Sequence, residues 1–266
     1  MKRSKPIASL DDYERAEQLV RAAAAGNVKR VRQLLEAGVN VNTFLENGAN
    51  ALIYAIIKGR TRVVRLLLER GADPSTKART GKYAGNSFPL HALAVAAEHG
   101  HLEIVRMLIR AGAQVNNSIT FNQDALSAAA SRGHTEVVRE LLTAGHQIDD
   151  GVGLKALRAA INHSMTQGPA LLLIEAGVKV DGEPGANLLI AAAQYHWATT
   201  VKALLEAGAD PTLKNYLGRS ALAGLNWLRQ HEIATKGREI NPRASERIRQ
   251  MISDAVASRR GRTRRR

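Results

Sequence analysis

A glycine, preceded in most cases by alanine, returns along this chain at a nearly constant interval. Successive glycines are separated by 33, 41, 33, 32 and 31 residues; they are Gly38, Gly71, Gly112, Gly145, Gly177 and Gly208. A fixed period of this length is the signature of a protein built from stacked copies of one small unit. The glycine spacing therefore restricts the chain to folds built from stacked repeats. The longer interval between the second and third glycines indicates an insertion of eight residues.

Each copy has the pattern of two helices joined by a tight turn. An apolar or small residue stands seven positions before each repeated glycine, as at Val64, and further apolar residues follow at +3 and +4, as at Leu67 and Leu68. This spacing forms one face of a helix, and the repeated glycine after it suits a left-handed C-cap. In four copies, another glycine 12 residues earlier follows an alanine-rich stretch such as residues 92–97. A helix pair of this size buries its apolar faces only against neighbouring copies, so we predict an all-α solenoid.

The second half of each copy resembles the ankyrin repeat family, in which a Gly-His turn precedes a Val-Val and Leu-Leu helix that ends in Gly-Ala-Asp. The resemblance is carried by Gly100-His101-Leu102-Glu103-Ile104-Val105, Gly112-Ala113, Gly133-His134-Thr135-Glu136-Val137-Val138, Gly145 and Gly208-Ala209-Asp210-Pro211. The first helices depart from the family pattern, and Tyr195-His196-Trp197 replaces the glycine turn of the sixth copy. The resemblance implies a non-enzymatic protein-interaction scaffold that binds a partner protein through its concave face and loop tips.

We divide the chain into three parts. Residues 1–9 form a basic N-terminal segment, residues 10–258 form the solenoid, and residues 259–266 form an arginine-rich tail that we expect to be disordered. The solenoid is expected to hold seven ankyrin-like units that start near residues 10, 44, 85, 118, 150, 182 and 214, and the insertion forms a basic finger over residues 74–90. The last unit departs most, and we expect its apolar stripe from Ile248 to Val256 to form a modified capping helix.

Charge and composition restrict where the protein works. The formal net charge is +14, but the two ends carry nine basic residues without an acid, so the body is only +5. The chain has no cysteine, and its longest apolar run, Ala51 to Ile57, is far shorter than a membrane span. We therefore expect a cytoplasmic monomer without a membrane segment or a signal peptide; a nuclear location in a eukaryote, or export as a bacterial effector, stays compatible with the sequence.

Candidate partner-binding residues combine aromatic rings and basic groups at the finger, the turn tips and the variable first-helix positions. They are Lys77, Arg79, Lys82, Tyr83, Phe88, Phe121, Arg132, His163, Tyr195 and Tyr216. The alternative is that the finger is a neutral loop and that several rings pack against neighbouring turns. We expect Trp197 to pack rather than bind.

The arginine-rich tail supports a second hypothesis, in which the chain is an adaptor anchored on nucleic acid or another polyanion. Its cations are Arg259, Arg260, Arg262, Arg264, Arg265 and Arg266. The alternative is a solubilising terminus. No nucleotide-binding loop, nucleophile elbow or metal-ligand spacing accompanies the histidines, so we predict no catalytic residue, no metal site and no cofactor.

Overall fold

The computed structural model describes residues 10–46, 48, 50–77, 90–116, 124–148, 151–180, 182–215, 217–225 and 242–263. Within these ranges the regular elements are helices, accompanied by two isolated β-bridges. The chain divides into two compact units, Met1–His146 and Gln147–Arg266. The predicted all-helical fold is confirmed for the described residues.

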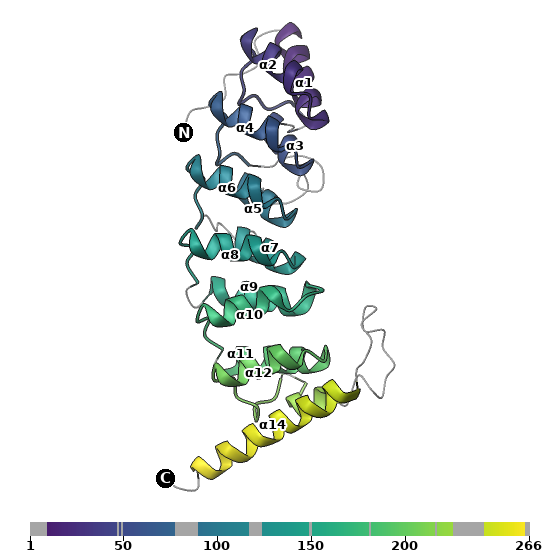
Figure 1. Ribbon diagram of the computed structural model, residues 1–266, viewed down its shortest axis with the longest axis vertical. Coiled ribbons are helices and arrows are strands. Elements are labelled where there is room, and N and C mark those ends of the chain that lie inside the picture. Colours follow the sequence, from purple (N-terminus) through teal and green to yellow (C-terminus); the bar gives the residue numbers. More distant parts are fainter. Residues whose placement is uncertain are drawn as a thin grey trace. The chain divides into compact units, whose positions relative to one another are not determined.

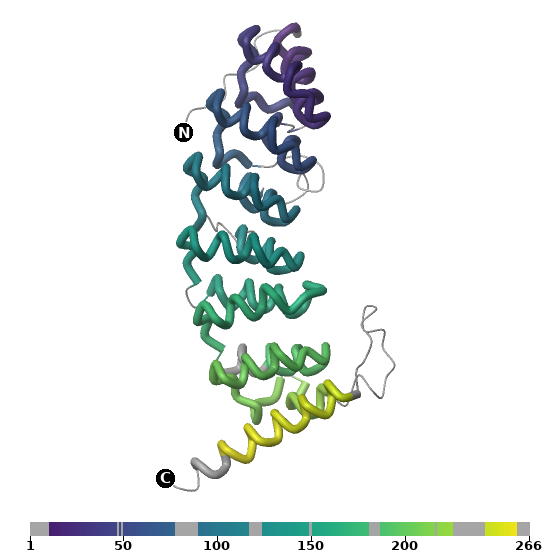
Figure 2. The backbone as a smooth tube through the Cα atoms, viewed as in Figure 1, coloured from purple at the N-terminus to yellow at the C-terminus, as the bar shows by residue number. Residues whose placement is uncertain are grey.

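The first unit is a stack of helix pairs (Figure 1). The helices are α1 (Leu10–Ala25), α2 (Val28–Glu36), α3 (Ala51–Ile57), α4 (Thr61–Glu69), α5 (Ala92–Glu98), α6 (Leu102–Arg110), α7 (Ala125–Arg132) and α8 (Thr135–Thr143). The first helices of the pairs, α1, α3, α5 and α7, contact one another in sequence, and so do the second helices α2, α4, α6 and α8. The backbone of this unit thus alternates between two layers of helices (Figure 2).

The second unit contains two further helix pairs and a long C-terminal helix. The pairs are α9 (Val152–His163) with α10 (Gly168–Glu175) and α11 (Gly182–Gln194) with α12 (Ala198–Glu206), followed by a helical segment at residues 221–225 and by α14 (Pro242–Thr263). Helix α14 packs against α12, buries Ile248 and Ile252 and exposes Glu246 and Arg247, as its amphipathic pattern predicts. The number of seven units and the capping role of α14 remain predictions.

Short polar side chains start several of the first helices. The Asn50 side-chain oxygen accepts hydrogen bonds from the backbone N–H groups of Leu52 at 3.0 Å and Ile53 at 3.3 Å. The Asp124 carboxylate accepts one from the N–H of Ser127 at 2.7 Å. These bonds satisfy donors that have no partner inside the helix. At two positions where the family pattern has threonine, this chain therefore caps the helix with asparagine or aspartate, whereas His91 makes no such bond at the start of α5.

The repeated glycines end the second helices in the left-handed conformation that the sequence predicts. All six have φ between +83° and +99°. A glycine in this conformation lets the backbone N–H groups after the helix close the last turn, as where Val39 N–H donates to Leu34 O at 3.1 Å. The glycine that recurs in the sequence is thus the residue that ends each second helix.

Small residues allow the first helices to pack closely. Residues 92–97 of α5, four of which are alanines, are all buried between α3 and α7. Leu67, Leu108 and Leu141 of the second helices are fully buried beneath them. The core consequently runs between the two helical layers and leaves the outer faces to polar residues.

The insertion lengthens the connection between the second and third helix pairs. Lys77 and His91 form an antiparallel bridge, and Ala92 N–H donates to Thr76 O at 2.8 Å. Thirteen residues lie between the two bridge partners, whereas five lie between Phe44 and Asn50 at the corresponding bridge of the preceding copy. The finger therefore begins at the base of a hairpin; Arg79, Lys82, Tyr83 and Phe88 lie outside the described residues.

The C-terminal helix extends past the predicted end of the solenoid. Helix α14 continues to Thr263, so the backbone of residues 259–263, which we assigned to a disordered tail, is helical. Arg259 Nη1 lies 2.5 Å from Asp210 Oδ2 and ties this stretch to the chain that follows α12. The boundary at residue 258 is therefore wrong for the helix, because a local run of arginines does not reveal a partner that is distant in sequence. Residues 264–266 lie outside the described part.

Candidate protein-binding surface

The turn between the two helices of a pair places one residue of every copy at the same position. In the first unit this position holds Lys58, His99 and Arg132, which we call the turn row, each eight residues after the N-cap residue of its first helix. Lys58 and Arg132 are exposed and His99 is half-buried. The second unit has His163, exposed, and Tyr195, half-buried, at the corresponding position. Three predicted binding residues, Arg132, His163 and Tyr195, thus share one structural register.

Contacts between adjacent copies orient the turn row. Arg132 Nη2 donates to Glu98 Oε1 at 2.9 Å, and this bond joins the ends of α7 and α5. The Arg132 side chain is 57% exposed and that of Glu98 only 14%, so the cation faces solvent while its partner is largely covered. The His99 ring stacks on the His101 ring with centroids 5.7 Å apart. The row therefore offers a positioned guanidinium and a positioned imidazole.

Residues at the start of the second helices hold neighbouring copies in register. Arg60 Nε donates to Ala24 O at 3.0 Å, and His134 Nε2 donates to Glu98 O at 3.0 Å. Both acceptors belong to the first helix of the preceding copy, whose last carbonyl groups have no partner inside the helix. The residue after the glycine of the turn thus joins adjacent copies through a hydrogen bond to a backbone carbonyl.

Burial favours the neutral form of two imidazoles in the first unit, His91 and His101, by lowering their pKa. Desolvation lowers the pKa of His101, and a hydrogen bond with the backbone of Ile57 only partly offsets it. Burial also lowers the pKa of His91, despite a hydrogen bond from its Nδ1 to Ser75 O at 3.1 Å. Neutral histidines that donate to backbone carbonyls stabilise turns, and both rings are half-buried.

The α11–α12 pair forms the turn between its two helices without glycine. His196 takes the left-handed conformation with φ of +56°, and its Nδ1 lies 2.8 Å from Ser245 Oγ of α14. Trp197 starts α12 and is buried, and the Tyr195 ring lies 6.0 Å from it. The expectation that Trp197 packs is confirmed, and Tyr195 beside it is half-buried.

The turn of the α9–α10 pair is ordered by side chains instead. Ser164 is buried, and its hydroxyl donates to Thr166 O at 2.9 Å. Gln167 Oε1 accepts from Thr200 Oγ1 at 2.9 Å and so joins this turn to α12. Met165, between them, is one of the two large apolar side chains exposed in the described residues.

Other predicted binding residues are not brought into this row. Lys77 is half-buried at the base of the finger, away from the helix turns in sequence and in its backbone pairing. Phe121 and Tyr216 lie outside the described residues, as do four of the finger residues. Arg132, His163 and Tyr195 share a position of the repeat, the first in one unit and the other two in the other, and all ten predicted positions stay predictions.

The sequence interpretation missed four cations on α2 and α4. Lys29, Arg32, Arg62 and Arg65 stand at matching positions of two adjacent copies. The sequence does show this difference when the copies are aligned with one another: the third and fourth copies have glutamate at the positions of Lys29 and Arg62. It was overlooked because the net charge was divided only between the body and the two ends.

The described residues contain neither a group of metal-ligating side chains nor a membrane-spanning helix. No group of three or more histidine, aspartate or glutamate side chains in the described ranges is arranged to hold a metal ion. Among the helices of the same ranges, none combines the length and the apolar character that a bilayer crossing requires.

Comparison with known proteins agrees with the helix-pair geometry. Residues 7–78 and 93–181, more than half of the chain, match the family model described as ankyrin repeats in three copies. The human ASB11 ankyrin repeat domain is similar in structure, with a TM-score of 0.67 and 27% sequence identity over 84% of this chain and 98% of that one. Comparison with curated proteins gives no match. With the family model covering most of both helical layers, the chain belongs to the ankyrin repeat family.

Proposed function

We propose that this chain is a non-enzymatic scaffold that binds a partner protein through the turn row of its first unit, and that His163 and Tyr195 have the same role within the second unit. Ankyrin repeats are in general protein-protein interaction modules. The observation that carries the proposal is the shared register of Lys58, His99 and Arg132, whose polar groups recur copy after copy on one edge of the first helices. A periodic row of this kind matches the extended surface that repeat proteins offer to partners.

The charges of the row favour a polar interface. Arg132 keeps one guanidinium edge occupied by Glu98 and is pre-oriented, so it loses less side-chain freedom on binding than an unrestrained arginine. In the second unit, Tyr195 adds a rigid ring that is buttressed by Trp197. Arginine and tyrosine are the side chains that most often dominate interface energies.

The proposal is tested by affinity capture from a nuclease-treated lysate of the source cells. The test variant carries Lys58→Ser, His99→Ser, Arg132→Ser and Tyr195→Ser. A matched control carries Gln33→Ser, Arg110→Ser, Lys202→Ser and Gln114→Ser, which are exposed positions outside the turn row. We expect one discrete protein to be retained by wild type and control and lost by the row variant; equal retention by all three chains would refute the assignment of this surface.

The polyanion hypothesis for the tail requires a modified test because Arg259 pairs with Asp210. Truncation after residue 258 would cut α14 as well as remove cations. Replacing Arg260, Arg262, Arg264, Arg265 and Arg266 with glutamine, while Arg259 is kept, separates charge from packing. Loss of salt-sensitive nucleic-acid binding in this variant alone would favour the tail hypothesis over the turn row.

A further inference from the structure

Two second helices of the first unit carry cations where their counterparts carry acids. The second residue is Lys29 in α2 and Arg62 in α4, but Glu103 in α6 and Glu136 in α8. A carboxylate near a helix N-terminus is favoured by the helix dipole, and a cation there is disfavoured. The first two copies therefore lack the favourable N-terminal carboxylate that the next two have. Residues that are unfavourable for local stability often serve a function such as binding.

Two more cations lie one turn further along the same helices. Arg32 follows Lys29 by three residues and Arg65 follows Arg62 by three, so each pair lies on one face of its helix. All four side chains are exposed, and α2 packs directly against α4. With neighbouring helix axes about 8–10 Å apart, these residues form a two-by-two arrangement that we call the basic quartet.

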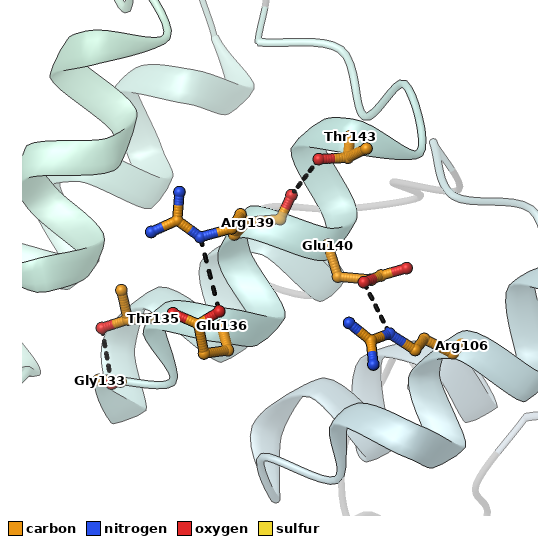
Figure 3. A network of polar contacts seen from close by, with 7 residues as sticks. All are labelled: Arg106, Gly133, Thr135, Glu136, Arg139, Glu140 and Thr143. Atoms are coloured by element: carbon orange, nitrogen blue, oxygen red, sulfur yellow. Dashed lines mark hydrogen bonds and ion pairs between the residues drawn. The ribbon is translucent and has the colours of Figure 1, made fainter.

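The positive charge of the quartet is nearly uncompensated. Within the described ranges its only ion pair joins Arg65 Nη2 to Glu103 Oε1, at 4.0 Å. At the same positions of α6 and α8, arginines are neutralised by near neighbours (Figure 3): Arg139 Nε lies 3.5 Å from Glu136 Oε2, and Arg106 Nε lies 2.8 Å from Glu140 Oε2. The helical scaffold is the same in both cases, so the difference lies in the residues at its surface.

We propose that the basic quartet binds an extended acidic segment of a partner protein. In a polyproline II conformation, residues three apart project from the same side at about 9 Å, which matches the distance between adjacent helices. Carboxylates repeated at that spacing would meet the Lys29–Arg32 column and then the Arg62–Arg65 column. The quartet lies on the second helices, so this surface is separate from the turn row and the proposed function can hold or fail without it.

The surroundings of the quartet favour a short acidic peptide over nucleic acid. Glu36 and Glu69 stand at the far ends of α2 and α4, and Glu103 borders the quartet on the third copy. These carboxylates would repel an anionic chain that continued past the quartet along α2 and α4 or onto α6, so they favour a short acidic segment over a long phosphate backbone. Helices α2 and α4 also contain no aromatic side chain on which a base could stack.

The test uses the full chain and a fluorescent peptide of four Glu-Glu-Pro repeats, with four Gln-Gln-Pro repeats as the uncharged control. The quartet variant replaces Lys29, Arg32, Arg62 and Arg65 with glutamine. The matched control replaces four other exposed or half-exposed second-helix cations with glutamine and removes the same charge: Arg106, Arg110, Arg139 and Lys202. Binding is measured by fluorescence polarisation at about 50 mM and about 200 mM salt, a range over which charge contacts weaken strongly.

We expect the acidic peptide to bind wild type and to lose about fifteen-fold in affinity with the quartet variant, as four exposed ion pairs of about two-fold each would give. The control variant should lose much less. The variant Lys29→Glu with Arg62→Glu, which restores the charge pattern of α6 and α8, should abolish binding and raise the unfolding temperature. This second readout shows that loss of binding does not come from loss of fold.

Three outcomes would overturn the proposal. The first is that the acidic peptide fails to bind wild type at low salt, and the second is that quartet and control variants lose affinity equally, which would make net charge the cause. The third is that single-stranded or duplex DNA binds more tightly than the peptide and depends on the same four side chains, which would assign the quartet to nucleic acid.

Discussion

Replacing Gly100 with alanine tests whether the Gly-His turn works through contact between copies. Gly100 has φ of +71°, and a Cβ at this position would lie 2.5 Å from both Cε1 and Nδ1 of His134 and 2.9 Å from its Cγ. Because Cγ is the ring atom nearest the backbone, rotation of the ring cannot clear the clash. Displacing the ring would also break the hydrogen bond from His134 Nε2 to Glu98 O at 3.0 Å.

Two costs add in this variant. Alanine in the left-handed conformation costs about 1–2 kcal/mol, and forcing an extra methyl group against a packed ring costs about 1–3 kcal/mol more. We therefore expect Gly100→Ala to lower the free energy of unfolding by about 2–5 kcal/mol. Gly112→Ala is the matched control, because Gly112 has φ of +92° and an added Cβ would meet no atom within 4 Å. It should show the backbone cost alone.

The assay is urea unfolding of the full chain, followed by far-ultraviolet circular dichroism, for both glycine variants and for each combined with His134→Ala. Removing the ring removes the clash, so in the His134→Ala background Gly100→Ala should cost no more than Gly112→Ala does. If the cost of Gly100→Ala were the same with and without the ring, or equal to that of Gly112→Ala in the wild-type chain, the reasoning would be refuted.

Asn50→Ala should lower the stability in thermal unfolding by about 1 kcal/mol, because the N–H groups of Leu52 and Ile53 lose their acceptor; an unchanged unfolding temperature would contradict this. Burial lowers the pKa of His101 and His196 in the folded chain, so the unfolded chain binds protons more readily, and the unfolding temperature should fall as pH drops below 6.5; an unchanged value between pH 7 and 5 would contradict this. Burial alone would raise the pKa of Asp210, but hydrogen bonds from Thr212 and the Arg259 guanidinium lower it overall. The stability from Asp210 should therefore persist above pH 3.8 and decline below it, and Asp210→Asn should remove that part of the acid sensitivity in the same melts.

The fold could be predicted from the sequence because its signals are local. The six repeated glycines mark the ends of second helices by their conformation; the leucines at +3 are buried, and the apolar residues at +4 are half-buried beside them. The apolar stripe of α14 was identified in the same way, since Ile248 and Ile252 lie one turn apart. Such patterns depend on residues within a few positions of one another, so they can be seen without a structure.

The candidate surface was predicted less completely. Arg132, His163 and Tyr195 could be placed because the repeat register carries over from copy to copy. The pairing of Arg132 with Glu98 could not be predicted, because two long side chains at adjacent copies meet only if the helices stack at a particular offset. The same holds for Arg259, which was assigned to a disordered tail. Its ion pair with Asp210, in the segment after α12, could not be predicted because the two residues are far apart in the sequence.

The sequence alone determined the repeat, the order of helices and turns, and the absence of a disulfide framework, since each depends on residue identity and short spacing. The tertiary structure decided which residues join one copy to the next: His134 to Glu98, Gln167 to Thr200 and Asp210 to Arg259. It also showed that the four cations of α2 and α4 share one exposed face while the equivalent positions of α6 and α8 are neutralised. Contacts between copies depend on how helices stack, and stacking is a property of the folded chain that no single segment of sequence contains.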